Sequence, residues 1–375
     1  MCFLKIRHYL AATLCMLSPL FCAAQEPAVS NEVSYVSFQV PGALGTFPMS
    51  INSTMAVTGY YYVSPMVTRG FLRQADGAIT TFDVPGGVST EPLSINAAGD
   101  VTGIVLVGNF SFGFIRYADG RIVTFENVSA TAQALPVSIN AFGEVAGNYR
   151  NVQNSSTGFT RSRAGEFTTL EYGGSFNATV VTGLNDSGTV VGYFAKDLSV
   201  VSTASFISQP DGFSTQFVVP VDVGNDGILA TAAQSINADG TIAGWYSAVM
   251  SSQPGAIATT GGFVRSPQGI FTLFNPPGTI VTSPRSVFPL DRGSLSAPQQ
   301  LSINQAGDIA GSYTDAAGVQ HGFVRNPYGT ITSFDPPRGG QTTATSINDS
   351  GLIAGYYFYD WNNHVAQGFL RLPKP

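Results

Sequence analysis

The sequence SINAAGDVTG at residues 94–103, followed by GFIRYADGRIVTF at residues 113–125, decides the fold because variants of it recur along the chain. The asparagine of its Ser-Ile-Asn element marks seven repeats, at steps of 44, 44, 45, 52, 67 and 44 residues. These asparagines are Asn52, Asn96, Asn140, Asn185, Asn237, Asn304 and Asn348. A repeat of about 44 residues is typical of a four-stranded propeller blade. The sequence therefore predicts an all-β, seven-bladed β-propeller of four-stranded antiparallel blades.

Four strands, a to d, can be placed in each repeat. Strand a ends at Ser-Ile-Asn, strand b contains an apolar residue two positions before a glycine, strand c contains Gly-Phe-x-Arg, and strand d contains a second phenylalanine. Blades that radiate from an axis have little room at their inner strands and more room outside. Small residues in strands a and b and phenylalanine in strands c and d fit this taper. We therefore expect the strand b glycine to be required because a larger side chain there would collide with the next blade.

The two ends of the repeat array complement each other. Residues 35–40 resemble the last strand of a repeat, but no repeat precedes them. The seventh repeat stops soon after Gly368-Phe369-Leu370-Arg371 and lacks its last strand. We expect the N-terminal strand to complete the C-terminal blade, which closes the ring and leaves no exposed sheet edge.

Turn chemistry divides the predicted molecule into two faces. The a–b link is Asn-x-x-Gly, with Met55 in place of glycine in the first repeat, and the c–d link also ends in glycine. Asparagine can bond its own turn backbone, and glycine supplies a positive φ. Because strands alternate in direction, both tight links lie on one face, the tight-turn face. The b–c and d–a links vary in length and form the variable face, where ligand binding is expected.

The N-terminal residues are typical of a secretory signal peptide. Lys5 and Arg7 precede an apolar run that ends in Cys22-Ala23-Ala24. The run is shorter than the ~20 residues that span a membrane. We predict a signal peptide at 1–24, a linker at 25–33 and one propeller domain at 34–375, in a protein that is exported and either secreted or periplasmic. All three cysteines lie in the leader, so the mature chain has no disulfide or thiolate chemistry.

The charge of the chain limits its partners. Charged residues make up 11% of the sequence, against about 25% in an average domain. Removing the leader changes the formal net charge from −6 to −8, because Lys5 and Arg7 are lost with it. This charge argues against nucleic acid and anionic membranes as partners. We expect a monomer that binds an extracellular glycan or protein ligand, without nucleic acid, membrane insertion or a cofactor.

The pattern Ser-Ile-Asn-x-x-Gly-x-Ile-Ala-Gly, followed by His321-Gly322-Phe323-Val324-Arg325, resembles the bacterial extracellular repeats of the HAF family. That family is named for a His-Ala-Phe element at this point, where six repeats of this chain have glycine for alanine and one has Ser205. The resemblance implies a secreted β-propeller and implies no activity.

Recurring polar groups have structural interpretations. The strand c arginines could form an anion-binding ring, but cross-strand ion pairs with acidic residues of strand b are the preferred interpretation. The expected pairs are Asp100 with Arg116, Glu144 with Arg161, and Asp308 with Arg325. The turns at 237–240 and 348–351 resemble parts of calcium loops, but they lack the further carboxylates of such loops and indicate no metal site. His321 is expected to be structural, and zinc-hydrolase and serine-hydrolase motifs are missing from the sequence.

The candidate binding residues lie on the variable face. The b–c loop of the seventh repeat combines tryptophan, histidine, amide and carboxylate groups, which suit a sugar, although an ordinary polar loop has the same composition. Insertions at 247–261 and 276–300 lie on the same face in neighbouring repeats, and a shorter one at 218–234 contains Asp222 and Asp226. The candidate residues are Asp360, Trp361, Asn363, His364, Arg285, Asp291 and Arg292.

Two functions remain open at this point. The leading hypothesis is a secreted, non-enzymatic binding or scaffolding module. The alternative is an extracellular enzyme, such as a polysaccharide lyase or hydrolase, because propellers host both. An enzyme needs a pair of carboxylates, or a histidine with an acid or tyrosine, to meet on the variable face. Asp291, Asp315, Asp360 and His364 are the possible members.

Overall fold

The computed structural model describes residues 33–126, 133–150, 156–172, 178–197, 202–224, 227–249, 257–279, 282–284, 301–360 and 365–373. The chain divides into two compact units, Met1–Glu32 and Val33–Pro375, and the described residues all belong to the second. Its described part is all-β, as predicted. It contains no helix that is long and apolar enough to cross a membrane.

The strands are numbered in chain order and grouped into blades, each named for the repeat that supplies it. Blades 1 to 3 comprise β2 (Gly45–Ile51), β3 (Val57–Ser64), β4 (Val67–Arg73) and β5 (Ile79–Phe82); β6 (Ser89–Ile95), β7 (Val101–Val107), β8 (Phe110–Arg116) and β9 (Ile122–Phe125); and β10 (Gln133–Ile139), β11 (Val145–Arg150), β12 (Ser156–Arg161) and β13 (Phe167–Leu170). Blades 4 and 5 comprise β14 (Thr179–Leu184), β15 (Val190–Asp197), β16 (Ser202–Ser208) and β17 (Ser214–Phe217); and β18 (Ile228–Ile236), β19 (Ile242–Val249), β20 (Ile257–Arg265) and β21 (Phe271–Phe274). Blades 6 and 7 comprise β23 (Ser302–Ile303), β24 (Ile309–Thr314), β25 (Gln320–Arg325) and β26 (Ile331–Phe334); and β27 (Gly340–Ile347), β28 (Ile353–Asp360), β29 (Val365–Arg371) and β1 (Tyr35–Phe38).

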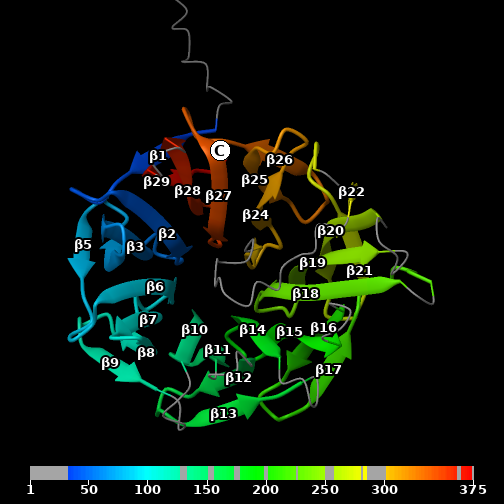
Figure 1. The fold of residues 1–375 in the computed structure, drawn as a ribbon, viewed down its shortest axis with the longest axis horizontal. Coiled ribbons are helices and arrows are strands. Elements are labelled where there is room, and N and C mark those ends of the chain that lie inside the picture. Colours follow the sequence, from blue (N-terminus) through cyan, green and yellow to red (C-terminus); the bar gives the residue numbers. More distant parts are fainter. Residues whose placement is uncertain are drawn as a thin grey trace, which may run out of the picture. The chain divides into compact units, whose positions relative to one another are not determined.

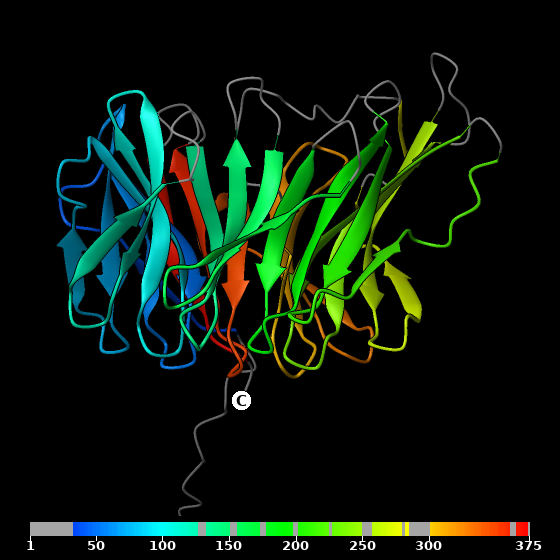
Figure 2. The ribbon, with the colours of Figure 1, turned by 90° about the horizontal axis from the view of Figure 1, so that it is seen from below.

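Within blades 1 to 6 strands a to d pair in chain order as an antiparallel meander, as predicted, and in blade 7 β1 takes the place of strand d. Blades 4 and 5 are joined into one larger sheet by a single parallel pair, Thr203 with Ala230. Figure 1 shows the sheets around a common centre, with the a strands innermost, and Figure 2 shows strands running between two opposite faces. The prediction of four-stranded antiparallel sheets is confirmed, and the pairings support the predicted seven blades.

The N-terminal strand completes the sheet of the seventh repeat. β1 pairs with β29 in the register Tyr35 with Arg371 and Phe38 with Gly368. The following link is also built like those inside the array, since the Val40 N–H donates to Thr46 Oγ1 and the Val84 N–H donates to Thr90 Oγ1. This pairing supports closure of the ring by the N-terminal strand.

The core is divided among the seams between blades. One cluster joins Leu72 and Val84 of blade 1 to Ile95, Val101 and Phe114 of blade 2. The largest buried side chains include one strand c phenylalanine from each repeat, none more than 2% exposed: Phe71, Phe114, Phe159, Phe206, Phe263, Phe323 and Phe369. The predicted taper, with small residues inside and phenylalanine outside, is present in the described blades.

The expected reason for the strand b glycine is wrong. A Cβ at Gly244 would collide with the Ala232 carbonyl oxygen and the Phe263 ring, and both belong to the same blade as Gly244. At Gly311 the colliding groups, Leu301 and Phe323, also lie in its own blade. The glycine therefore leaves room for the buried phenylalanine of strand c and for the neighbouring strand a, not for the next blade.

The two long insertions meet on the variable face. In blade 5 the inserted b–c link extends the hairpin, so that Ser247 pairs with Thr260 and Val249 with Ala258. The short strand β22 (Thr282–Pro284), from the insertion before blade 6, pairs with β20. The sequence placed these insertions next to each other, and their described parts do share a sheet.

Phe38→Ala is expected to destabilise the chain by about 3–5 kcal/mol, the cost of deleting a buried aromatic side chain. Phe38 packs on Phe71 of blade 1 at a centroid distance of 6.1 Å, so its loss weakens the seam between the last blade and the first. Chemical denaturation measures the change. Val36→Thr, at an exposed position of the same strand, is the control and should change stability little. Equal stability of the two variants would contradict a structural role for this strand.

Gly244→Ala is expected to cost about 1–3 kcal/mol, because the added methyl group overpacks the interior of blade 5. Gly340 is a matched glycine in a strand, where the nearest atom to an added Cβ is the Phe358 carbonyl oxygen at 3.7 Å. Gly340→Ala should therefore leave stability unchanged or raise it by up to about 1 kcal/mol, through the unfolded chain. Melting temperatures that fall equally in both variants would argue against this explanation.

Candidate functional site

The Asn-x-x-Gly turns have the predicted structure. In blade 2, the Gly99 N–H donates to the Asn96 carbonyl at 3.1 Å, and the Asp100 N–H donates to Asn96 Oδ1 at 2.9 Å. The glycines of the other turns have positive φ, and Met55 takes the same conformation in blade 1 with φ of 65°. The side-chain oxygen of the asparagine thus holds its own turn together.

The same asparagines connect neighbouring blades through Nδ2. Asn52 Nδ2 donates to the Asn96 carbonyl at 2.9 Å, and Asn96 Nδ2 donates to the Asn140 carbonyl at 3.0 Å. The same hydrogen bond, from Nδ2 to the next asparagine carbonyl, recurs from Asn140 through Asn185, Asn237 and Asn304 to Asn348. Asn348 Nδ2 then donates to the Asn52 carbonyl at 3.0 Å. These hydrogen bonds form a closed cycle. Sequence reasoning missed it, because the turn pattern explains the side-chain oxygen of each asparagine and leaves the partner of its Nδ2 unassigned.

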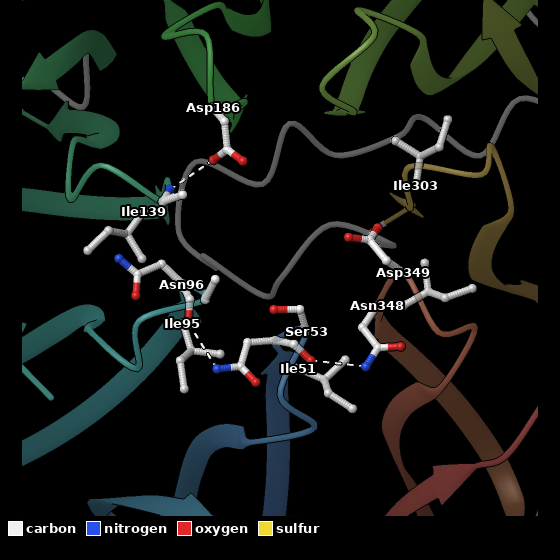
Figure 3. Close-up of a pocket in the computed structure, with 13 residues that line it drawn as sticks. Ile51, Ser53, Ile95, Asn96, Ile139, Asp186, Ile303, Asn348 and Asp349 are labelled. Atoms are coloured by element: carbon white, nitrogen blue, oxygen red, sulfur yellow. Dashed lines mark hydrogen bonds between the residues drawn. The ribbon is translucent and has the colours of Figure 1, made fainter.

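A cavity of about 260 Å³ lies inside this cycle on the tight-turn face. Figure 3 shows Asp186 and Asp349 at its edge and isoleucine side chains of several blades around it. Asp186 Oδ1 accepts a hydrogen bond from the Ala141 N–H at 2.8 Å, and Asp349 Oδ1 accepts one from the Gln305 N–H at 2.9 Å. Among the described residues that line the cavity, these oxygens and the asparagine amides already serve the turns, and none of them indicates a ligand.

The expected ion pairs of the strand c arginines are wrong. Each guanidinium lies over a phenylalanine of the preceding blade, with its carbon 4.8–5.2 Å from the ring centroid, as with Arg116 over Phe82. The acidic residues turn toward the axis instead, where Glu144 Oε2 accepts a hydrogen bond from Asn140 Nδ2 at 2.7 Å. Arg73, Arg161, Arg325 and Arg371 are buried, so these arginines do not form an anion-binding ring either.

His321 lies between two carboxylates on the variable face. Its Nδ1 is 2.7 Å from Asp335 Oδ2, and its Nε2 is 3.3 Å from Asp315 Oδ2. Burial alone would lower the pKa of His321, but the two carboxylates outweigh burial and raise it. In blade 1 the corresponding positions hold an ion pair between Arg69 and Asp83 at 3.0 Å. The pair of His321 with Asp335 is therefore a variant of a repeated contact, which supports its expected structural role.

Five aromatic side chains form an aromatic cluster on the variable-face half of blades 7 and 1. The buried ring of Phe47 lies at its centre, stacked on Tyr60 at 5.2 Å and in edge contact with Tyr62 at 5.5 Å and Tyr356 at 5.0 Å. Phe358 is the fifth member, 6.3 Å from Phe47. The three tyrosines and Phe358 are partly exposed, so the cluster presents aromatic surface to solvent.

In blades 3 and 6 the position of Tyr60 and Tyr356 has a structural task. It is the residue after the strand b glycine, and in blade 3 it is Asn148, which exchanges two hydrogen bonds with the backbone of Val181 in the next blade. In blade 6 it is Ser312, whose Oγ accepts a hydrogen bond from the Ala344 N–H. The residue at this position thus satisfies the free backbone edge of the next blade.

The tyrosines are free of this task. Four positions before the asparagine, where Val181 and Ala344 stand in blades 4 and 7, blades 1, 2 and 3 have Pro48, Pro92 and Pro136. Proline has no N–H, so Tyr356 and Tyr60 have no donor to satisfy in the blade that follows them. Fold alone does not require tyrosine at these positions.

Glu91, at the position in β6 that corresponds to Phe47 in β2, brings a carboxylate to the aromatic cluster. Its Oε1 accepts a hydrogen bond from Thr68 Oγ1 at 3.1 Å. Burial raises the pKa of Glu91, and the Thr68 bond only partly opposes this. Burial and then the nearby Glu91 carboxylate raise the pKa of Tyr60 and of Tyr62. In the described part of the chain, no arginine, lysine or histidine forms an ion pair with Glu91.

Exposed apolar side chains lie on the variable face of blades 1 and 2. They come from the b–c and d–a links and the strand ends beside them: Leu44, Val63, Met66, Val88, Leu106, Val107 and Phe110, of which Met66 is 87% exposed. On the tight-turn face such residues occur singly in different blades, as with Phe142 and Tyr328. A concentration of exposed apolar side chains on one face is typical of an interaction site.

Most of the predicted binding residues fall outside the described residues. These are Trp361, Asn363, His364, Arg285, Asp291 and Arg292, and of Asp360 only the backbone is described, paired with Val365 at the end of β28. Asp315 is described and bonds His321. The aromatic cluster and Glu91 were missed. A comparison of equivalent positions in the repeats finds Glu91, because the other blades have no carboxylate five positions before the asparagine.

In the described part of the chain, no three His, Cys, Asp or Glu residues are grouped in a way that could hold a metal ion. The turns at 237–240 and 348–351 have the hydrogen bonds of the other Asn-x-x-Gly turns, with the Gly240 N–H and the Gly351 N–H donating to the asparagine carbonyls. Their structure supports the interpretation of these segments as turns.

Comparison with known proteins places the chain among propeller folds. No family model matches it, so the HAF resemblance stays a prediction, and no curated protein matches it. A streptogramin B lyase has a TM-score of 0.58 at 11% identity, over 91% of this chain and 98% of that chain. A catalytically inactive histidine-to-alanine variant of virginiamycin B lyase from Staphylococcus aureus, crystallised with quinupristin, has 0.57 at 14%, over 91% and 100%. Puromycin hydrolase has 0.52 at 16%, over 86% and 52%. The predicted β-propeller fold is confirmed, and these identities carry no further conclusion.

Asn52→Asp is expected to destabilise the chain at neutral pH by about 1–3 kcal/mol, because the Asn96 carbonyl loses its buried donor. The new carboxyl keeps the three bonds that Asn52 Oδ1 accepts from Thr54 and Ala56. Only the protonated form of this carboxyl can donate a hydrogen bond to the Asn96 carbonyl. The loss should therefore shrink as pH falls toward about 4. Denaturation at both pH values, with Asp119→Asn in an exposed turn as control, tests this, and a loss independent of pH would contradict it.

Proposed function

We propose that the protein is an exported binding module that takes its ligand on the variable face, at blades 7, 1 and 2. The observation that carries the proposal is the aromatic cluster beside Glu91. Partly exposed tyrosine rings offer flat apolar surface with a polar end, and one carboxylate can fix the orientation of a ligand. The leader sequence supports export, and the resemblance to HAF repeats agrees with it.

The position of the cluster favours binding over packing alone. Tyr60 and Tyr356 stand where proline removes the structural task of the repeat, and their rings remain partly exposed. The apolar links of blades 1 and 2 extend this surface outward. Loops and strand ends of this face can vary without disturbing the asparagine cycle on the opposite face, and function usually resides in such variable parts.

The second candidate function is an enzyme of the same face. It is favoured by the fold neighbours, which include a lyase inactivated by replacement of a histidine and a hydrolase. In this chain, however, both ring nitrogens of His321 are bonded to carboxylates. A general base needs a free nitrogen within reach of its substrate. Within the described residues, the structure therefore favours binding over catalysis.

Tyr62→Ala is expected to weaken ligand binding at least about tenfold, because it removes an aromatic face from the cluster. The measurement is a screen of the chain on arrays of glycans and small organic compounds, followed by calorimetric titration of each hit. Tyr328→Ala is the matched control, since Tyr328 is 93% exposed on the tight-turn face. Hits that respond to Tyr328→Ala but not to Tyr62→Ala would refute the location.

The same preparations distinguish binding from turnover. Each hit, and quinupristin as the compound held by the lyase variant, is incubated with the chain and followed by mass spectrometry. A binding module leaves these compounds intact. Catalytic conversion that survives repeated purification would favour the enzyme alternative.

A further inference from the structure

Glu91 has a carboxylate that the fold does not use. In the described structure its one hydrogen-bond donor is Thr68 Oγ1, and no basic side chain lies within ion-pair distance. A partly buried carboxylate without a counter-charge disfavours folding, because water and cations that would stabilise it are displaced. At the same position of β2, Phe47 fills the space with an apolar ring. A charge at this position therefore has a purpose other than stability.

The groups around Glu91 are suited to a positive charge. Thr68, which donates to Glu91, is the cross-strand partner of Tyr62, so the carboxylate lies beside Tyr62. The Tyr60 ring is in edge contact with Tyr62 at 6.1 Å. Aromatic ring faces attract cations, most strongly where water is excluded. Burial raises the pKa of all three tyrosines of the aromatic cluster, so their hydroxyl groups stay protonated and Glu91 is the carboxyl group beside them. The nearby Asp83 carboxylate is paired with Arg69.

We propose that Glu91, together with Tyr60 and Tyr62, binds the substituted ammonium group of a small organic cation. The carboxylate supplies the opposite charge, and the two tyrosine rings supply the cation–π contacts. The apolar side chains of blades 1 and 2 accommodate the carbon skeleton of the ligand.

A neutral sugar fits these observations less well. It stacks on tyrosine and hydrogen-bonds a carboxylate, but it leaves the charge of Glu91 uncompensated. An ammonium group compensates the carboxylate charge and is further attracted by the net negative charge of the chain. The inference rests on the proposed binding function of this face and specifies its ligand class.

The test is calorimetric titration of the chain with choline, with the uncharged carbon analogue of choline, and with a methyl glucoside. Choline should bind at least about tenfold more tightly than its carbon analogue, because only choline pairs with the carboxylate. Glu91→Gln should abolish this difference, since the amide keeps the shape and the Thr68 bond but loses the charge. Glu126→Gln, an exposed carboxylate of the same blade, is the matched control for net charge and should change choline affinity less than twofold.

The outcomes separate the inference from the proposed function. Equal affinity for choline and its carbon analogue, or choline binding unaffected by Glu91→Gln, overturns the inference. Binding of the glucoside without choline, lost in Tyr62→Ala, also overturns it and leaves the binding function standing. If neither compound binds, the inference falls, and the binding function is decided by the array hits and their response to Tyr62→Ala. If Tyr62→Ala changes neither choline nor glucoside binding, both proposals fall.

Stability of the free chain gives an independent readout. Burial raises the pKa of Glu91 in the folded state, so ionisation favours unfolding at pH 7, and the effect vanishes below the unfolded-state pKa of about 4.3. Glu91→Gln should therefore raise the melting temperature at pH 7 and leave it unchanged at pH 4. A residue retained for structure would lower the melting temperature when replaced, and that result at pH 7 would overturn the inference.

Discussion

The fold depends on an amide that serves two structures at once. Each repeat asparagine uses Oδ1 to close its own turn and Nδ2 to bond the carbonyl of the corresponding asparagine in the next blade, as Asn52 does with Asn96. Aspartate keeps the first role and loses the second, and serine or threonine is too short to take both. The constraint therefore selects one residue type at the centre of every blade. It also fixes the height of neighbouring blades relative to one another, since the cycle returns from Asn348 to Asn52.

Contacts further from the axis follow from this alignment. With the turns level, the strand c arginine of one blade lies over the strand d phenylalanine of the preceding one, as Arg371 lies over Phe334 at 4.8 Å. A buried ion pair would have to compensate two desolvated charges, whereas an aromatic face requires no second charge. The guanidinium also donates to the carbonyl of the next residue, as Arg73 does to Gln74. Neighbouring blades thus hold together with few ion pairs, which is consistent with the low charge of the chain.

The sequence predicted what lies within a repeat and missed what lies between repeats. Strand order, the tight turns and the pairing of β1 with β29 follow from local pattern and from counting strands. The contact partner of each strand c arginine does not follow from local pattern. The sequence spacing to Asp100 or Glu144 allows an ion pair, but the blade geometry places the arginine over a phenylalanine instead. The strand b glycine shows the same limit. The sequence indicates that it lies in a crowded place, but not that the crowding groups belong to its own blade. Glu91 was missed because a single glutamate in a strand attracts no attention until all repeats are compared position by position.

Repeats provide a control for function that a single-copy fold lacks. A residue that recurs, such as the asparagine of the turn, is explained by the scaffold, whereas a residue that departs at an equivalent position needs its own reason. Pro48 and Pro92 remove the backbone donor that Asn148 and Ser312 serve elsewhere, and the aromatic side chains stand beside that change. Glu91 departs further, because it places an uncompensated carboxylate where an apolar residue would be more stable. The chain tolerates the destabilising carboxylate on the variable face and keeps the turns of the tight-turn face uniform. We infer that stability depends mainly on the tight-turn face and recognition on the variable face.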